Sequence, residues 1–362
     1  MGSEMCIRDS ISTSDNLRNY IAEHSARKRN LVHRSIESTI LTCPDRFINR
    51  NSGLTITCSA MEVDDKRKTM VLENASVING AQTQGEIRRF LEDIAEEDDD
   101  SWRPAGFHVR AEIILDPDHA SVVETAIARN SATKVQSISQ AGARGHLNEL
   151  NEIMKTATGK GIRMSETQED VHDTFHVLRC ARLLMPEAVV GKKTNTELLK
   201  PYMNKAKCLE DFSSWFDQRK TDENSRLKYD FTLSIAPAAV AEYDYWEKST
   251  SWCGHRIWED TQKGGRICKR DDSNSIIWMS PGIMYPLLGA IAEFVQKNDD
   301  GKWVIQKPNA FKPANMIEKT VQIFRGFDSK PMAMGRNPMA YTQLADGPKT
   351  LLGLLKDLGV TN

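Results

Sequence analysis

The sequence lacks the cysteine pairs that mark disulfide frameworks and zinc ribbons. Its seven cysteines lie at irregular spacing, and none forms a Cys-x-x-Cys pair. Such usage fits the reduced thiols of a cytosolic protein better than a disulfide-stapled secreted one. The cluster of Cys253 and His255 with Cys268 falls short of the four regularly spaced ligands that zinc usually takes. We therefore expect ordinary thiols and a cytoplasmic location.

The sequence also lacks a long hydrophobic run and a strong charge of either sign. Its longest apolar stretch, residues 276–295, is interrupted by prolines, glycines and a glutamate, which excludes a transmembrane helix there. With 48 Lys and Arg against 50 Asp and Glu, the formal net charge is -2. This balance argues against a uniformly basic nucleic-acid binder, so any contact with DNA or RNA should be confined to one face. No membrane partner is expected.

Several catalytic signatures are absent as well. No Gly-x-Ser-x-Gly elbow and no Walker A run occurs. His172 and His176 have the i, i+4 spacing of zinc ligands on a helix, but the Glu that follows the first His in metalloproteases is missing. Because Val171 and Phe175 would give that helix an apolar face, a structural role is favoured over a metal site. No cofactor can be assigned.

The most informative stretch is residues 76–86, which read SVINGAQTQGE. An apolar strand end runs into Asn79-Gly80, a dipeptide that tolerates positive φ. Thr83 followed by Glu86 has the spacing of a capping box at a helix start. Two interpretations remain open. The turn is either an ordinary junction fixed by its cap, or a loop whose backbone N–H groups and helix dipole face a phosphate or another anion.

Three segments, in order, resemble the AIPR family, named for abortive-infection phage resistance. Residues 77–83 (VINGAQT) resemble its apolar run followed by N-G-x-Q-T, and residues 44–56 (PDRFINRNSGLTI) resemble its P-x-x-F-x-x-x-N-N-G-I-T-I segment. Residues 127–135 (IARNSATKV) resemble its A-x-N-S-Q-N-P-V segment, from which Ala132-Thr133-Lys134 departs. The resemblance covers roughly residues 20–185. It implies a bacterial or phage-associated defence protein.

The same turn resembles, more distantly, the D-G-Q-H-R turn of ParB-like proteins, where a strand-to-helix junction forms part of a nucleotide or nucleic-acid site. Asn79 stands where that pattern has Asp, and Thr83 stands where it has Arg. A bound phosphate would lack its main arginine partner, which favours recognition over nucleotide hydrolysis. Arg88, Arg129 or Lys134 could replace that arginine only if the fold brings one of them to the turn.

The candidate ligand-binding residues are polar residues and glycines at strand ends and turns of the matched segments. Loops on a rigid sheet are where sites tend to occur, and side-chain amides suit the edge of a base or a sugar. The set comprises Asn49, Asn51, Gly53, Asn79, Gly80, Gln82, Thr83, Arg129, Asn130 and Ser131. No catalytic residue and no metal ligand can be named.

The hydrophobic pattern predicts an α/β (α+β) fold, with a small mixed sheet and packed helices in the N-terminal half and a mainly helical C-terminal half. Strands are expected at 53–60, 70–72, 77–78 and 107–115, and helices at 13–41, 84–95, 119–129 and 137–157. The first strand should bury one face, because its apolar residues alternate with Thr and Ser. In the first helix, His33 should lie on the charged surface. The two domains should span 11–165 and 166–362.

Residues 1–10 differ in kind from the rest. Gly2 to Asp9 resemble the translation of a common sequencing-library adaptor, so we exclude them from the fold prediction. AIPR proteins generally carry an additional region before the part matched here. We therefore expect the natural protein to extend further upstream.

Three functions remain open. The leading hypothesis is AIPR-type phage defence in which the α/β half recognises a nucleotide or nucleic acid at the N-G-x-Q-T turn. The second is a non-catalytic interaction or sensor module that holds a phage or host protein, with its effector nuclease in the upstream region or in a partner. A metal-dependent nuclease within the chain ranks third, since Asp64-Asp65-Lys66 is better explained as a hairpin turn.

Overall fold

The computed structural model describes Ser12 and residues 31–96, 108–130, 137–165, 168–260 and 266–359. Within these ranges the chain forms helices and four small sheets of two or three strands, which confirms the predicted α+β fold. Its internal contacts divide it into two compact units, Met1–Gly145 with Met164–Glu169, and His146–Arg163 with Asp170–Asn362. No described helix is long and apolar enough to cross a membrane.

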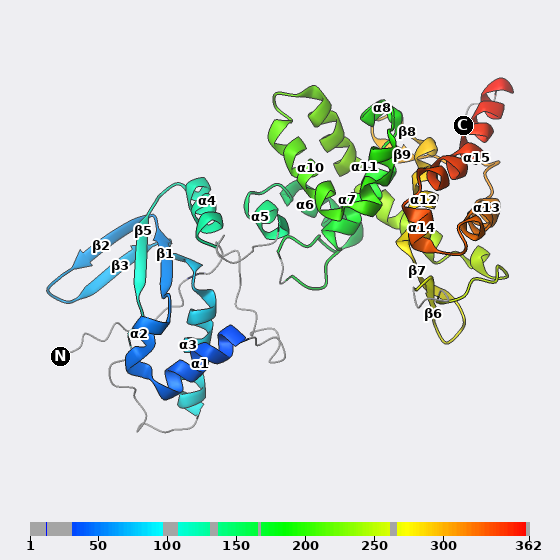
Figure 1. The fold of residues 1–362 in the computed structure, drawn as a ribbon. Helices are drawn as coiled ribbons and strands as arrows, with labels where there is room; N and C mark the ends of the chain where they lie inside the picture. The colour runs from blue at the N-terminus through cyan, green and yellow to red at the C-terminus, as the bar shows by residue number, and fades with distance from the viewer. Residues whose placement is uncertain are drawn as a thin grey trace. The chain divides into compact units, whose positions relative to one another are not determined.

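A three-stranded sheet with the order β4-β1-β5 forms the centre of the first unit (Figure 1). β1 (Leu54–Cys58) pairs antiparallel with β4 (Ser76–Asn79) and parallel with β5 (Ala111–Leu115). A separate ribbon of β2 (Ala60–Asp64) and β3 (Thr69–Glu73) extends from the sheet. The predicted turn lies at the tip of this ribbon, where the Asp64 carboxylate accepts two backbone hydrogen bonds of 3.0 Å each.

Helices pack on both faces of this sheet. On one face, Ile78 packs with Val122 and Ala126 of α4 (His119–Asn130). Ile56 and Val77 point to the opposite face, because side chains alternate along a strand, and both are buried. On that side α3 (Ala81–Glu96) packs on β1 and on α1 (Leu31–Thr42), which joins α2 (Phe47–Arg50) through the short 3₁₀ turn η3 (Pro44–Arg46).

The prediction that β1 buries only one face is wrong. Thr55 is 8% exposed and Thr57 is 2% exposed. The Thr57 hydroxyl donates a 3.4 Å hydrogen bond to the carbonyl oxygen of Ser76, so it is satisfied inside the sheet. β1 is a central strand covered on both faces, although its alternation of apolar and polar residues usually marks a strand with one exposed face.

The single helix predicted over residues 137–157 is two helices, α5 (Ser137–Ala143) and α6 (Asn148–Thr158). Gly145, at a φ of +75°, lies between them. Gly159, at a φ of +76°, ends α6 as predicted. α6 belongs to the second unit, where it packs on α11 (Glu223–Glu247).

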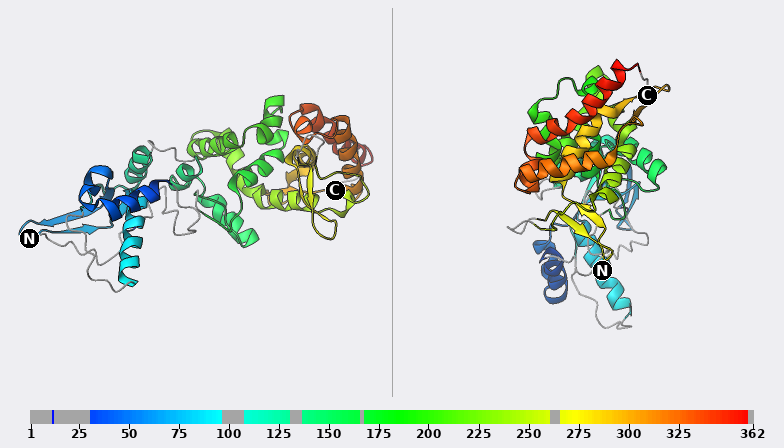
Figure 2. Two further views of the ribbon diagram at one scale, coloured as in Figure 1. Left: turned by 60° about the horizontal axis from the view of Figure 1, so that its bottom comes forward. Right: turned by 90° about the vertical axis from the view of Figure 1, so that its right-hand side faces the viewer.

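The long helix α11 runs through the second unit and also contacts α7 (Thr174–Leu183) and α10 (Lys205–Gln218). α12 (Pro281–Ile291) packs on α15 (Pro338–Asp357), and α13 (Pro313–Gly326) lies beside α15 (Figure 2). The other described elements are α8 (Glu187–Val190), α9 (Asn195–Met203), α14 (Pro331–Gly335), η4 (Thr250–Trp252), η5 (Ala292–Phe294), β6 (Cys268–Arg270), β7 (Ile276–Met279), β8 (Val295–Lys297) and β9 (Trp303–Ile305).

A largely buried network of charges joins α7, α9 and α10. Arg182 lies 2.5 Å from Glu197 and 2.9 Å from Asp211, and Lys200 lies 2.7 and 3.1 Å from the same carboxylates. The Arg182 side chain is only 8% exposed. Burial alone would raise the pKa of Glu197, but hydrogen bonds from Lys200 and Arg182 outweigh it and lower that pKa. Arg182 and Lys200 thus balance the two carboxylates away from bulk water, and the exposed Lys207 reaches Asp211 at 3.4 Å from the surface.

Arg182→Ala is expected to lower the free energy of unfolding of the second unit by about 3 kcal/mol, because Lys200 is then the one largely buried cation left for Glu197 and Asp211. Urea denaturation followed by tryptophan fluorescence measures this loss. Arg226→Ala is the matched control, since Arg226 is 58% exposed in its pair with Glu223 and should cost less than about 1 kcal/mol. Equal losses in the two variants would contradict the role given to the network.

Candidate functional site

β4 ends at Asn79 and α3 begins at Ala81, so the predicted order of strand, turn and helix is confirmed. Gly80 lies between them at a φ of +101°, a region that glycine enters without strain. Its carbonyl oxygen accepts a 3.0 Å hydrogen bond from the N–H of Gln84, the first bond of the helix. The helix therefore starts earlier than the predicted residue 84.

The predicted capping box is wrong, because Thr83 lies inside the first turn of α3 and not before it. Its hydroxyl pairs instead with the Asn51 side chain. Asn51 Nδ2 donates to Thr83 Oγ1 at 3.0 Å, and Thr83 Oγ1 donates to Asn51 Oδ1 at 3.2 Å. Asn51 Oδ1 also accepts from the N–H of Gly53 at 2.8 Å. The Asn51 amide therefore fastens the loop before β1 to the start of α3.

Two predicted glycines allow three backbone segments to meet at this end of the sheet. A Cβ on Gly80 would lie 2.6 Å from the carbonyl oxygen of Gly53. A Cβ on Gly53, whose φ is +84°, would lie 2.2 Å from the carbonyl oxygen of Arg110. That carbonyl accepts a 2.9 Å hydrogen bond from the N–H of Leu54. The start of β1, the end of β4 and the approach to β5 are therefore in direct contact.

Arg129 brings the third predicted segment to the same place. Asn79 Nδ2 donates a 3.4 Å hydrogen bond to the Arg129 carbonyl oxygen, and the Arg129 guanidinium lies 2.7 Å from Glu112 on β5. The Arg129 side chain stays 44% exposed. Of the other predicted residues, Asn130 is the last residue of α4, and Asn49 is exposed on α2. Ser131 lies outside the described residues.

Gln82 does not point away from the fold as a free amide. Its Oε1 is hydrogen-bonded to His33 Nε2, which comes from α1. His33 is completely buried, so its predicted place on the charged surface is wrong. Glu86, on the next turn of α3, is also buried, at 2% exposure. No sequence signal marks this pair, because a single His among charged helical residues has the pattern of a solvated face.

Two charged residues at this end of the sheet are absent from the predicted set. Arg110 immediately precedes β5 with its side chain exposed, and Glu112 on β5 binds Arg129. Their alternation with Val109 and Ala111 is the signal that could have found them, since it places both side chains on one face of the strand. Glu112 contacts Arg129 from that face of the strand.

The AIPR protein family matches residues 14–325 of the sequence. The chain belongs to the AIPR family. The match extends well past the predicted limit near residue 185 and reaches into α13, so it includes most of the second unit. No curated protein and no solved structure matches the chain. Membership supports a role in abortive infection and phage defence.

The zinc spacing considered for His172 and His176 is not realised in this AIPR protein. His172 precedes α7, and its N–H donates to the carbonyl oxygen of Gly161 at 2.9 Å. Asp173 caps the helix by accepting from the N–H of Phe175 at 3.2 Å. The two imidazoles therefore do not share a helical face. Among the residues that the structure describes, no group of three or more His, Cys, Asp and Glu could hold a metal ion.

His176 and Cys180 lie one turn apart on α7, with Nε2 and Sγ separated by 3.6 Å. A close Cys and His is the usual arrangement of a nucleophilic thiol. Here burial raises the pKa of the Cys180 thiol far above its ordinary value and lowers the pKa of His176. Both shifts favour the neutral forms, whereas thiolate chemistry needs the charged pair. The pair therefore belongs to the core.

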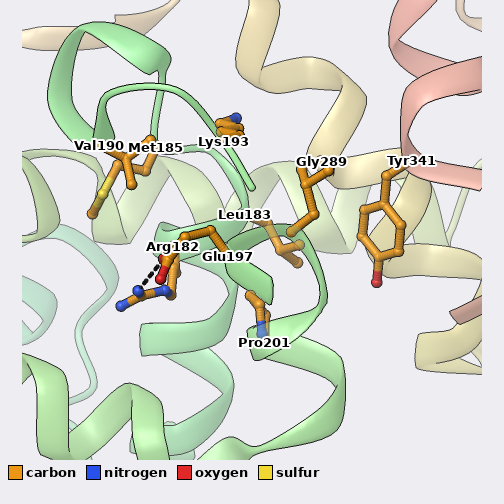
Figure 3. A pocket seen from close by; sticks show the side chains of 10 residues that line it. Arg182, Leu183, Met185, Val190, Lys193, Glu197, Pro201, Gly289 and Tyr341 are labelled. Carbon is orange, nitrogen blue, oxygen red and sulfur yellow. Dashed lines mark hydrogen bonds and ion pairs between the residues drawn. The ribbon is translucent and has the colours of Figure 1, made fainter. Parts of the chain in front are cut away.

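A narrow pocket of the AIPR chain lies beside the ion network of the second unit (Figure 3). Arg182, Glu197 and Lys193 are among the residues that line it, and the first two face each other. Burial lowers the pKa of the Lys193 amine, while the nearby carboxylates of Glu293 and Glu187 oppose that shift. Because Arg182 and Glu197 neutralise each other, the lining offers one amine between apolar walls. It does not assemble a catalytic set.

Gly80→Ala is expected to destabilise the first unit by about 2–4 kcal/mol, through positive φ and the clash with Gly53 together. Hydrogen exchange of the β1 and β4 amides measures the loss. Gly159→Ala is the control, because Gly159 has a φ of +76° but nothing within 4 Å of its Cβ position. Gly159→Ala should lower the free energy of unfolding of the second unit by about 1–2 kcal/mol, the strain of placing alanine at a positive φ. Equal costs would argue against the close approach at Gly53.

The lowered pKa of His176 also predicts a pH dependence. Burial is the main cause of the shift, and Asp173 and Asp244 oppose it. The folded state therefore resists protonation, while the unfolded chain takes up a proton near pH 6.5. Stability of the second unit should be full above about pH 6.5 and should fall as the pH drops below that value toward the lower pKa of the folded state.

Urea midpoints at several pH values measure this effect. His176→Gln should remove most of the decline, whereas His255→Gln, in a loop of the same unit, should leave it in place. A decline that persists unchanged in His176→Gln would assign it to other groups.

Proposed function

We propose that this AIPR protein serves phage defence by recognising a nucleotide or nucleic acid at the end of the sheet where β1 begins and β4 ends. One observation carries the proposal. Three segments far apart in the sequence, 44–56, 77–83 and the described part of the third, 127–130, meet there through the Asn51–Thr83 and Asn79–Arg129 hydrogen bonds. Chance resemblance would give no reason for the three to converge.

Arg129 is the group that we assign to a phosphate. It supplies the cation that the N-G-x-Q-T turn lacks when compared with ParB-like turns, and its side chain stays 44% exposed. Glu112 holds it at 2.7 Å in the free protein, so a phosphate would compete with that carboxylate. Arg110, exposed just before β5, adds a second positive charge to the same edge. The expected field therefore favours an anionic ligand.

Asn79 is the amide that we assign to a base or a sugar. Its bond to the Arg129 carbonyl is long, at 3.4 Å, so re-pairing with a ligand costs little. Asn51, Thr83 and Gln82 are bonded within the fold and act as positioning residues. Recognition fits this set better than hydrolysis, because Asn79 and Thr83 stand where ParB-like turns have Asp and Arg.

A second function is favoured by a different observation. The bonds from Asn51 to Thr83 and from His33 to Gln82 occupy side chains of the turn, as they would in a purely structural junction. In that case the chain is an interaction or sensor module that holds a phage or host protein. Its effector nuclease would then be a separate activity.

Asn79→Ala combined with Arg129→Gln is expected to weaken nucleotide or nucleic-acid binding by roughly 10- to 100-fold, the worth of a charged hydrogen bond. Loss of one phosphate contact should also reduce the slope of the logarithm of the binding constant against the logarithm of the salt concentration by about one unit. Titration of ATP, GTP, single-stranded and double-stranded DNA, and RNA into the full chain measures both. Arg67→Gln is the matched control, since Arg67 is 83% exposed at the tip of the β2–β3 ribbon.

Two results would count against the proposal. Wild-type affinity in a folded Asn79→Ala/Arg129→Gln variant would remove the site assignment. Absence of binding to every ligand by the wild type would favour the interaction module instead.

A further inference from the structure

The second unit carries an open groove between α11 and β9. Its floor is a stripe of small residues on α11, among them Pro237, Ala238 and Ala241, and its sides include Tyr245 and Trp303. β9 packs on α11, and the N–H of Trp303 donates a 3.2 Å hydrogen bond to the hydroxyl of Ser234. From Ser234 to Tyr245 the helix rises about 16 Å, which gives the groove the length of a few nucleotides.

Two aromatic rings stand at the ends of this groove. Tyr245 is 47% exposed, and Trp303 is half-buried against Phe231, at 5.3 Å between ring centroids. The small side chains between them leave a flat floor that a planar ring can approach. Partly exposed rings along one groove are the usual stacking platforms for unpaired bases.

Lysines accompany both rings. Lys297 Nζ lies 5.2 Å from the ring centroid of Trp303, and Lys307 Nζ lies 4.7 Å from that of Tyr245. Lys302 also lines the groove and is exposed. At Trp303 a base can take the ring face while a phosphate draws the Lys297 ammonium aside, whereas at Tyr245 the ammonium of Lys307 stays paired with Glu242.

The groove has a positive balance of charge. Its lining carboxylate, Glu242, is 10% exposed and lies 2.5 Å from Lys307, so that pair is neutral overall. Trp246 Nε1 also donates to Glu242 at 2.5 Å. Asp299 and Asp300, in the turn between β8 and β9, are not among the lining residues. Lys302 is therefore the lining cation that Glu242 does not neutralise, while Lys297 lies outside the lining, beside the Trp303 ring.

We propose that this groove binds single-stranded nucleic acid, with bases stacked on Tyr245 and Trp303 and a phosphate held by Lys302. The combination of exposed rings, a flat floor and net positive charge fits a strand of unpaired nucleotides. An acidic peptide would use the lysines but would gain little from the rings. The site lies in the second unit and shares no residue with the β4–α3 turn, so it stands apart from the function proposed above.

The test uses the full chain and fluorescein-labelled 12-nucleotide oligo(dT) and oligo(U), followed by anisotropy at two salt concentrations. Tyr245→Ala and Lys302→Glu should each weaken binding by roughly 10-fold or more, the stacking variant at both salt concentrations and the charge variant mainly at low salt. We choose these two positions because Trp303 packs on the core residue Phe231, and Lys307 neutralises Glu242. Loss of either would disturb folding.

Trp258→Ala and Lys269→Glu are the matched controls. Trp258 is 75% exposed and Lys269 is exposed, and neither lines the groove. Both should bind as the wild type does. Tyr245→Ala should weaken oligonucleotide binding by the same factor in the Asn79→Ala/Arg129→Gln background as in the wild type, which separates this site from the one in the first unit.

Three outcomes would overturn the inference. The first is wild-type affinity in both groove variants. The second is a loss of oligonucleotide binding seen only in the Asn79→Ala/Arg129→Gln variant. The third is that poly-glutamate binds as tightly as the oligonucleotides and displaces them completely, which would make the groove a site for acidic protein segments.

Discussion

Where β1 begins and β4 ends, the carbonyl oxygen of Gly53 occupies the space that a side chain on Gly80 would need. This close approach sets the distance between the two strand ends, and with it the point at which α3 leaves the sheet. The Asn51–Thr83 bonds can form only because the two loops lie so near each other. The first unit therefore depends on two positions without a side chain, and the polar contacts of the candidate site are built around them.

The polar residues of the family-like motifs fall into two groups, those hydrogen-bonded within the fold and those with an exposed side chain. Asn51, Thr83 and Gln82 are bonded to other parts of the fold, whereas Arg129 keeps an exposed guanidinium. Within the segments that resemble the family, Asn79 and Arg129 are therefore better placed to meet a ligand than Asn51, Thr83 and Gln82. Rigid side chains lower the entropy cost of binding, so the bonded amides still contribute, as a frame for the groups that make contact.

The features that depend on neighbouring residues could be predicted from the sequence, whereas those that depend on distant residues could not. The order of strand, turn and helix at 76–96 was predictable, because β-branched residues, Asn-Gly and helical periodicity are local signals. The start of α3 was not, since Asn51 lies far upstream and takes the Thr83 hydroxyl that the capping box required. Burial of His33 and of the β1 threonines likewise depends on partners brought in by tertiary packing. Among the site residues, the glycines and Asn79 were found, but Arg110 and Glu112 were missed.

The chain passes between its two units three times, after Gly145, after Arg163 and after Glu169. Helix α6 follows the first crossing and packs on α11, while the short segment Met164–Glu169 returns to the first unit. The two units therefore alternate along the sequence, and each is built from two separate segments of the chain. A single cut in the chain therefore cannot separate one complete unit from the other, so removing either unit by truncation would also take a segment from its neighbour or leave a segment of itself behind.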